Sequence, residues 1–64
     1  DHVYALDAKD GRILVFQKDS KTGNLIYVTQ YLFENSDELR DLYVNPDSKK
    51  MYVLTKSKVL EVGL

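Results

Sequence analysis

The chain of 64 residues contains no cysteine and no tryptophan, and it has one histidine and one proline. Without cysteine it can form neither a disulfide nor a thiolate metal site. One histidine, His2, with scattered carboxylates is too few ligands for a transition-metal site, so no metal and no cofactor are predicted. Ser48 has no histidine near it in the sequence to act as a base, and no catalytic residue is predicted.

Strong charge and long hydrophobic runs are also missing. A formal net charge of −1 produces no strong field, so neither nucleic acid nor a membrane surface is expected as a partner. No apolar run approaches the length that spans a bilayer. Exposed strands often carry lysine because it keeps strand edges from pairing, and four lysines follow the single proline. They are Lys49, Lys50, Lys56 and Lys58. The sequence indicates no cellular compartment.

What the chain does have is a series of short segments rich in β-branched and aromatic residues, separated by turn residues. Asp10-Gly11 between two such segments is a strong hairpin signal, because type I′ turns need positive φ at both central residues. Gly23-Asn24 and Asn45-Pro46 mark two further turns. The pattern predicts an all-β protein with antiparallel strands. The clearest strand segments are Val3–Leu6, Ile13–Gln17, Leu25–Phe33, Lys50–Leu54 and Val59–Val62.

The stretch from Leu39 to Tyr43 is ambiguous. Asn35 followed by Glu38 imitates a helix capping box, and the apolar residues behind it have helical spacing. Pro46, however, would end a helix within two turns. The internal repeat of the chain favours a strand here, with a short helix as the alternative.

The chain also repeats itself. Val3–Leu6 returns as Met51–Leu54, which matches Tyr4 to Tyr52, and Ile13–Phe16 returns as Val59–Val62. The spacing, roughly 46 to 48 residues, is typical of repeats built from short strands, such as the blades of a β-propeller. We therefore expect parts of two β-propeller blades, with Tyr4 and Tyr52 packed between blades.

The expected organisation is a single unit covering residues 1–64. Residues 1–34 would supply strands two to four of one blade, and residues 35–64 strands one to three of the next. Because the sequence begins inside a strand-like segment, we expect it to have been cut from a larger protein. Two incomplete blades expose strand edges, so the chain alone should be poorly folded or associated with partners.

Two propeller families resemble parts of this sequence. Val3–Leu14 resembles the quinoprotein (pyrroloquinoline-quinone dehydrogenase-like) repeat, although the tryptophan position of that repeat holds Val15. Ile13–Leu25 and Leu39–Val53 are similar to the lactonase-like seven-bladed repeat. Both resemblances imply a propeller fold.

The lactonase-like resemblance also bears on the candidate site. Members of the phosphogluconolactonase type have an Arg-His pair where this chain has Arg40 and Asp41, so the resemblance does not imply enzymatic activity. Arg40 and Asp41 are our candidates for ligand-facing residues on an innermost strand. The plainer interpretation of the two is an exposed ion pair that orders the connector.

The expected function is a structural and interaction scaffold that binds a ligand or protein. Its expected partners are the remaining propeller blades or other protein chains. The alternative is part of a lactonase- or quinoprotein-type propeller enzyme completed by other chains. A third possibility is a repeat that self-assembles into a closed ring. A minor candidate for an aromatic binding surface is Tyr31 with Phe33.

Alternation within the strands predicts which residues form the core. The predicted core is Leu14, Phe16, Ile26, Val28, Leu42, Val44, Tyr52, Leu54 and Leu60.

Overall fold

The computed structural model describes residues 2–64, and every regular element in that range is a β-strand. The expectation of an all-β, antiparallel chain is confirmed. The segment with the ambiguous pattern forms strand β4, so the helical alternative is wrong. The strands are β1 (His2–Asp7), β2 (Arg12–Lys18), β3 (Leu25–Leu32), β4 (Leu39–Asn45), β5 (Lys50–Thr55) and β6 (Val59–Gly63).

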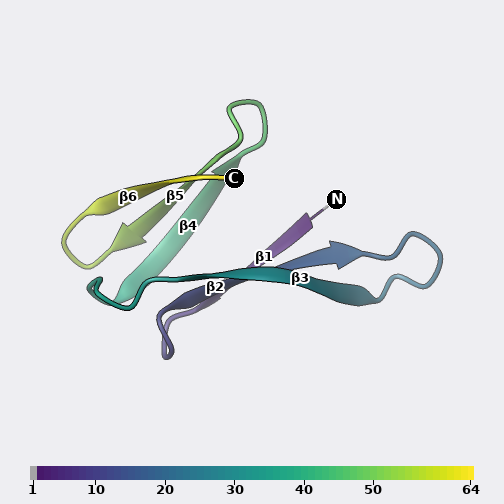
Figure 1. Ribbon diagram of the computed structural model, residues 1–64, viewed down its shortest axis with the longest axis horizontal. Helices are drawn as coiled ribbons and strands as arrows, with labels where there is room; N and C mark the ends of the chain where they lie inside the picture. Colours follow the sequence, from purple (N-terminus) through teal and green to yellow (C-terminus); the bar gives the residue numbers. More distant parts are fainter. Residues whose placement is uncertain (1) are drawn as a thin grey trace.

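The strands form two separate antiparallel sheets of three (Figure 1). Sheet A has the order β1-β2-β3 and sheet B the order β4-β5-β6, so each strand pairs only with its neighbours in sequence. Within residues 2–64, the edges of β1, β3, β4 and β6 that face away from their own sheet therefore have no strand partner. Such edges are places where further strands can add.

The turns are built by the residues that the sequence marks for them. Between β1 and β2, Gly11 has φ 63°, and the Asp10 backbone N–H donates to Asp7 Oδ1 at 3.3 Å. Between β4 and β5, Asn45 Oδ1 accepts the Asp47 N–H at 3.1 Å. This second turn ends on Lys49 at φ 56°, in the left-handed region that a residue with a Cβ enters at a cost.

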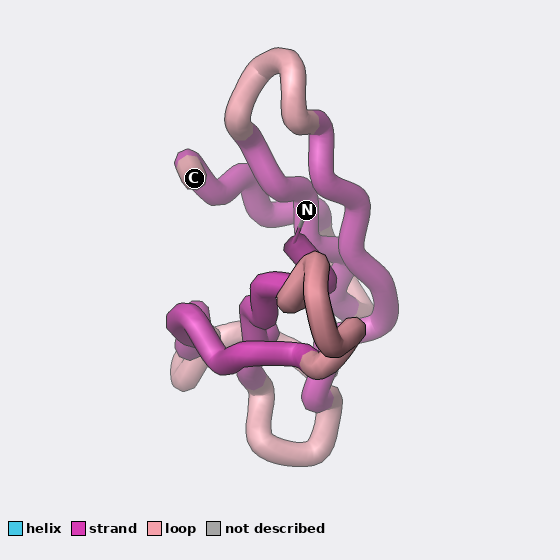
Figure 2. The backbone as a smooth tube through the Cα atoms, turned by 90° about the vertical axis from the view of Figure 1, so that its right-hand side faces the viewer, coloured by secondary structure: helices cyan, strands magenta, loops and turns pink. Residues whose placement is uncertain are grey.

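The core lies between the two sheets, which cross one another (Figures 1 and 2). Its buried members are Ile13 of β2, Leu39 of β4, and Met51 and Val53 of β5. Partly buried apolar side chains surround them on both sheets, and together they make one apolar layer. These are Tyr4, Leu6, Tyr31, Phe33, Leu42, Val44, Leu60 and Val62.

The observed core differs from the predicted one because β2 and β5 turn the opposite face toward it. Of the predicted residues, only Leu42, Val44 and Leu60 lie against the core, and they are partly buried. The prediction was wrong for four residues on the outward faces of β2 and β5. They are Leu14, Phe16, Tyr52 and Leu54. Because alternate side chains point to opposite faces, choosing the wrong face moves every side chain of a strand.

The prediction was also wrong for Ile26 and Val28, which are 54% and 47% exposed. In Figure 1 the end of the β2–β3 hairpin extends past sheet B, so nothing covers it there. The ladder between these strands is also irregular beside Val15, where one residue of β3 is passed over. The apolar start of β3 is consequently an exposed hairpin end.

The connector between the sheets is held at both ends by backbone hydrogen bonds. The Phe33 N–H donates to the Gly11 carbonyl at 2.9 Å, and the Lys56 N–H donates to the Glu38 carbonyl at 3.0 Å. The first bond ties the connector to the β1–β2 turn and the second to the β5–β6 turn. Both turns therefore help to set how the sheets lie on each other.

Candidate interaction surface

The two hairpins β1–β2 and β5–β6 have the same cross-strand register at the positions that the sequence matches. In each hairpin, the two matched residues of the first strand lie opposite the two matched residues of the second. The pairs are Tyr4–Val15 and Leu6–Ile13 in sheet A, and Tyr52–Glu61 and Leu54–Val59 in sheet B. Matched residues therefore lie on the same side of each hairpin.

That shared side points toward the core in sheet A and away from it in sheet B. Tyr4 packs against the buried cluster, as expected of a residue between sheets. Tyr52 lies on the side of sheet B turned away from sheet A, so the expectation that it also packs between sheets is wrong for residues 2–64. The side of sheet B that carries Tyr52 is therefore open, whereas the corresponding side of sheet A, which carries Tyr4, is covered.

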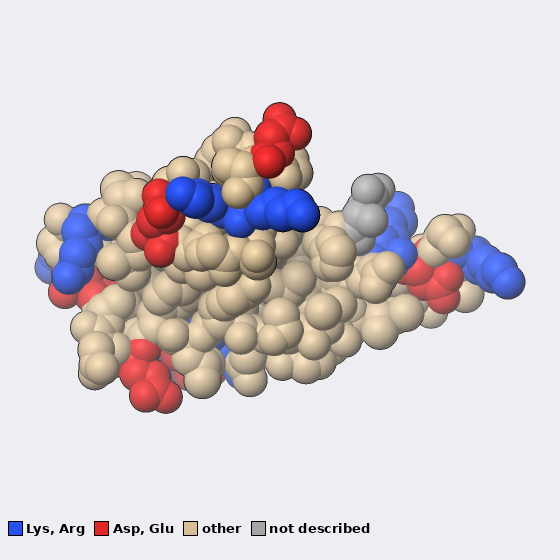
Figure 3. All heavy atoms as spheres, turned by 45° about the horizontal axis from the view of Figure 1, so that its top comes forward, with Lys and Arg blue, Asp and Glu red and all other residues tan. Residues whose placement is uncertain are grey.

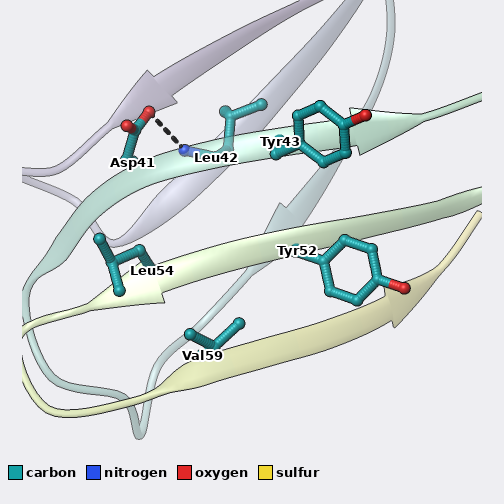
Figure 4. A pocket seen from close by; sticks show the side chains of 6 residues that line it. All are labelled: Asp41, Leu42, Tyr43, Tyr52, Leu54 and Val59. Atoms are coloured by element: carbon teal, nitrogen blue, oxygen red, sulfur yellow. Dashed lines mark hydrogen bonds between the residues drawn. The ribbon is translucent and has the colours of Figure 1, made fainter.

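We call the open side of sheet B the B-face and define it by five residues. They are Asp41, Tyr43, Tyr52, Leu54 and Val59 (Figure 4). Together with Leu42 they line a shallow hollow of ≈ 270 Å³. Tyr43 and Val59 are each 62% exposed and Leu54 is 45% exposed. Grouped exposed apolar residues are characteristic of surfaces that bind a partner.

Polar groups of sheet B lie around the B-face and are already engaged. Lys50 Nζ lies 3.2 Å from Glu61 Oε2, in an exposed pair worth at most about 1 kcal/mol. Asp41 Oδ1 accepts the Leu42 backbone N–H at 2.8 Å, as Figure 4 shows. An apolar, aromatic centre with a polar margin is the usual composition of a protein-binding surface.

The outward side of sheet A, the A-face, is apolar as well. It is defined by Val3, Ala5, Leu14, Phe16 and Tyr27, which alternation places opposite the core. Phe16 and Tyr27 meet edge to face, with ring centroids 6.2 Å apart at 74°. In the view of Figure 3, the molecule as a whole also has a broad surface area without charged side chains, with acidic and basic groups at its margins.

The A-face has a polar end built around Arg12. Its Nε donates to Asp7 Oδ2 at 2.9 Å, and its Nη1 donates to Gln30 Oε1 at 3.3 Å. The hydrogen bond from Arg12 holds the pKa of Asp7 below its ordinary value, and the same bond raises the pKa of Arg12. This end of the sheet is a charged, hydrogen-bonded margin.

A second hollow, of ≈ 590 Å³, lies where the first and last described residues approach the β4–β5 turn. His2, Tyr4, Pro46, Lys49 and Leu64 are among its lining residues. The lining includes no carboxylate and no hydroxyl nucleophile apart from the tyrosine phenol. The side chains of this groove that can exchange a proton are His2, Tyr4 and Lys49.

The two candidate ligand-facing residues, Arg40 and Asp41, lie at an irregularity of β4. The β4–β5 ladder shifts register between Leu39 and Asp41. Arg40 Nε lies 3.0 Å from Glu38 Oε2, and the Arg40 side chain is 52% exposed. Asp41 lines the hollow of the B-face, whereas Arg40 is not among its lining residues. The structure therefore does not bring the two into one site.

Sequence reasoning missed most of the B-face. It named Tyr31 and Phe33 as a possible aromatic surface, but both pack against the core. Tyr43 and Tyr52 lie directly opposite one another across the β4–β5 ladder. The alternation of Asp41 and Tyr43 in β4 was the available signal, because residues two apart share a face.

Residues 2–64 contain no group of three or more histidine, aspartate or glutamate side chains placed to hold a metal ion. In the same range, no helix is long and apolar enough to cross a membrane.

A comparison with known protein families, with curated proteins and with solved structures found no significant match to this chain.

Proposed function

We propose that this chain is a structural and interaction scaffold made of two repeat sheets of the β-propeller kind. In this proposal sheet A holds strands two to four of one blade, and sheet B holds strands one to three of the next. Its partners are further sheets of the same kind, in the remaining blades or in other protein chains. The observation that carries the proposal is that each sheet has one covered apolar face and one open apolar face.

Three features support it. The hairpins β1–β2 and β5–β6 keep one register at matched positions, as copies of one repeat would. The A-face and the B-face expose large apolar side chains, as surfaces that await a partner do. The outer strands of both sheets have unpaired edges within residues 2–64, where the missing strands of each blade would add.

The enzyme alternative, a lactonase- or quinoprotein-type propeller completed by other chains, finds no comparable support. It would need partner segments that carry histidine, glutamate and arginine side chains toward a common channel. In this chain Arg40 pairs with Glu38, and Asp41 accepts a hydrogen bond from the Leu42 backbone N–H.

Sedimentation and thermal unfolding of the chain over a wide range of concentrations test the scaffold proposal. If the open faces need a partner, the folded form is associated, and its unfolding temperature rises with concentration by mass action. A folded monomer with cooperative unfolding at one temperature, whatever the concentration, would contradict the proposal. It would mean that the six strands are a self-sufficient domain.

A further inference from the structure

The open faces of the two sheets correspond to the two faces already in contact inside the molecule. On the side of sheet A that covers sheet B lie Tyr4, Leu6 and Ile13. Their matched residues Tyr52, Leu54 and Val59 make up most of the B-face. The B-face therefore offers a neighbouring sheet side chains at the same repeat positions as those that sheet A packs against sheet B.

The same relation holds in reverse for the A-face. Each of its residues on β1 and β2 matches a residue on the inward side of sheet B. Those inward residues are buried or packed against the core. The matches are Val3 with Met51, Ala5 with Val53, Leu14 with Leu60 and Phe16 with Val62. The A-face therefore offers a neighbouring sheet side chains at the same repeat positions as those that sheet B packs against sheet A.

From this correspondence we propose that a second copy of this chain docks head to tail, with its A-face against the B-face of the first. The new interface repeats the internal one. Sheet A of the second copy lies against sheet B of the first copy in the way that sheet B lies against sheet A within one copy. This inference rests on the proposed function and names the partner for its open faces. It is an extension of an interface already present in the molecule.

The proposal also defines the symmetry of the assembly. One copy uses its B-face and the other its A-face, so the contact is heterologous rather than two-fold. Heterologous contacts form rings when the rotation between copies closes, and open chains when it does not. The hollow of ≈ 270 Å³ on the B-face lies between Tyr52 and Leu54, where apolar side chains of the second copy would enter.

Blocking variants test the direction of docking. Leu54→Glu places a negative charge on the B-face, and Leu14→Glu places one on the A-face. Each variant alone lacks one half of every contact, so each is expected to sediment as a monomer. Mixed, the free B-face of Leu14→Glu and the free A-face of Leu54→Glu form a 1:1 dimer, which cannot grow because the two blocked faces carry charges of the same sign. Ile26→Glu is the matched control, because Ile26 is 54% exposed and belongs to neither face, and it should associate as the wild type does.

A milder pair of variants covers the case in which a charge prevents folding. The wild-type chain has no cysteine, so Ala5→Cys and Leu54→Cys each add the only thiol. Facing sheets lie about 10 Å apart, beyond the reach of a disulfide, so a bis-maleimide linker joins the thiols. Head-to-tail docking predicts crosslinked heterodimers in a mixture of the two, in large excess over homodimers. Two-fold docking predicts homodimers from each variant alone.

The outcomes separate this inference from the proposed function. Crosslinked homodimers from an associating chain would overturn head-to-tail docking and leave the scaffold proposal standing. A wild-type chain that stays unassociated, and folds only when another protein is added, would overturn the second copy as the partner. A folded, concentration-independent monomer would overturn both.

Discussion

Tyr4 and Tyr52 hold matching positions in two hairpins of the same register, but they face opposite ways relative to the core. Tyr4 of β1 packs against the residues buried between the sheets, and Tyr52 of β5 lies on the open side of sheet B. The difference arises because sheet A has its neighbour on the side of Tyr4, whereas the same side of sheet B has no neighbour within residues 2–64. The buried position of Tyr4 thus shows the kind of contact, a second sheet, that Tyr52 lacks within residues 2–64.

Two isoleucines provide the clearest test of the core. Ile13 is 0% exposed and Ile26 is 54% exposed, although both lie in strands of sheet A. We expect Ile13→Ala to lower the free energy of unfolding by about 2–5 kcal/mol, because it empties a closed site. Ile26→Ala, the matched control, should change it by less than about 1 kcal/mol. Urea denaturation at one protein concentration measures both, and equal losses would contradict the observed burial of Ile13 and exposure of Ile26.

Neighbouring residues at the start of β4 test the other sheet. Leu39 is 2% exposed and belongs to the buried cluster, whereas Arg40 is half exposed and pairs with Glu38. Leu39→Ala should lower the unfolding free energy by about 2–5 kcal/mol. Arg40→Ala should lower it by at most about 1 kcal/mol, since exposed ion pairs contribute little. The same denaturation experiment compares them, and a larger loss for Arg40→Ala would mean that β4 presents its other face to the core.

The pH dependence of Asp7 follows from its hydrogen bond with Arg12. The folded-state pKa of Asp7 is lowered, so its contribution to stability is complete above the ordinary aspartate pKa of about 3.9. The contribution disappears as pH falls through the lowered folded-state pKa. Arg12→Gln should return the pKa of Asp7 toward its ordinary value, as measured by NMR titration of the carboxyl carbon.

Asp19 is the internal control for that titration. Its pKa is also lowered, but mainly by the Lys21 backbone N–H, which donates to Asp19 Oδ1 at 2.9 Å. Arg12→Gln should leave the pKa of Asp19 unchanged. If both carboxyls shift together, the variant has disturbed the whole sheet and the assigned cause is wrong.

The turn before β5 offers a stabilising substitution. Lys49 has φ 56°, and glycine adopts this conformation without the penalty that a Cβ imposes. We expect Lys49→Gly to stabilise the protein by about 0.5–1 kcal/mol. Lys50→Gly is the control and should destabilise it, because Lys50 is in a strand and pairs with Glu61. Thermal unfolding of both variants at matched concentration measures the difference, and destabilisation by Lys49→Gly would contradict this account of the turn.

Local signals in the sequence were enough to predict five of the six strands and the turns, whereas for β4 they left a short helix as an alternative. Asp10-Gly11 and Asn45-Pro46 stand at two observed turns, and the β-rich segments between turns form the six observed strands. These features depend on a few adjacent residues and on the backbone conformations that those residues favour. The match between Tyr4 and Tyr52 was likewise visible before the structure, and the register of both hairpins agrees with it.

The sequence by itself determined approximately where the strands lie, but only the tertiary structure decided which face of each strand is buried. In β2, Ile13 and Leu14 are adjacent and almost equally apolar, and so are Val53 and Leu54 in β5. Alternation assigns each pair to opposite faces without saying which face is covered. That depends on which side of each sheet has a neighbour. In residues 2–64 each sheet has one neighbour, so Ile13 and Val53 are buried, while Leu54 is left on an open apolar face.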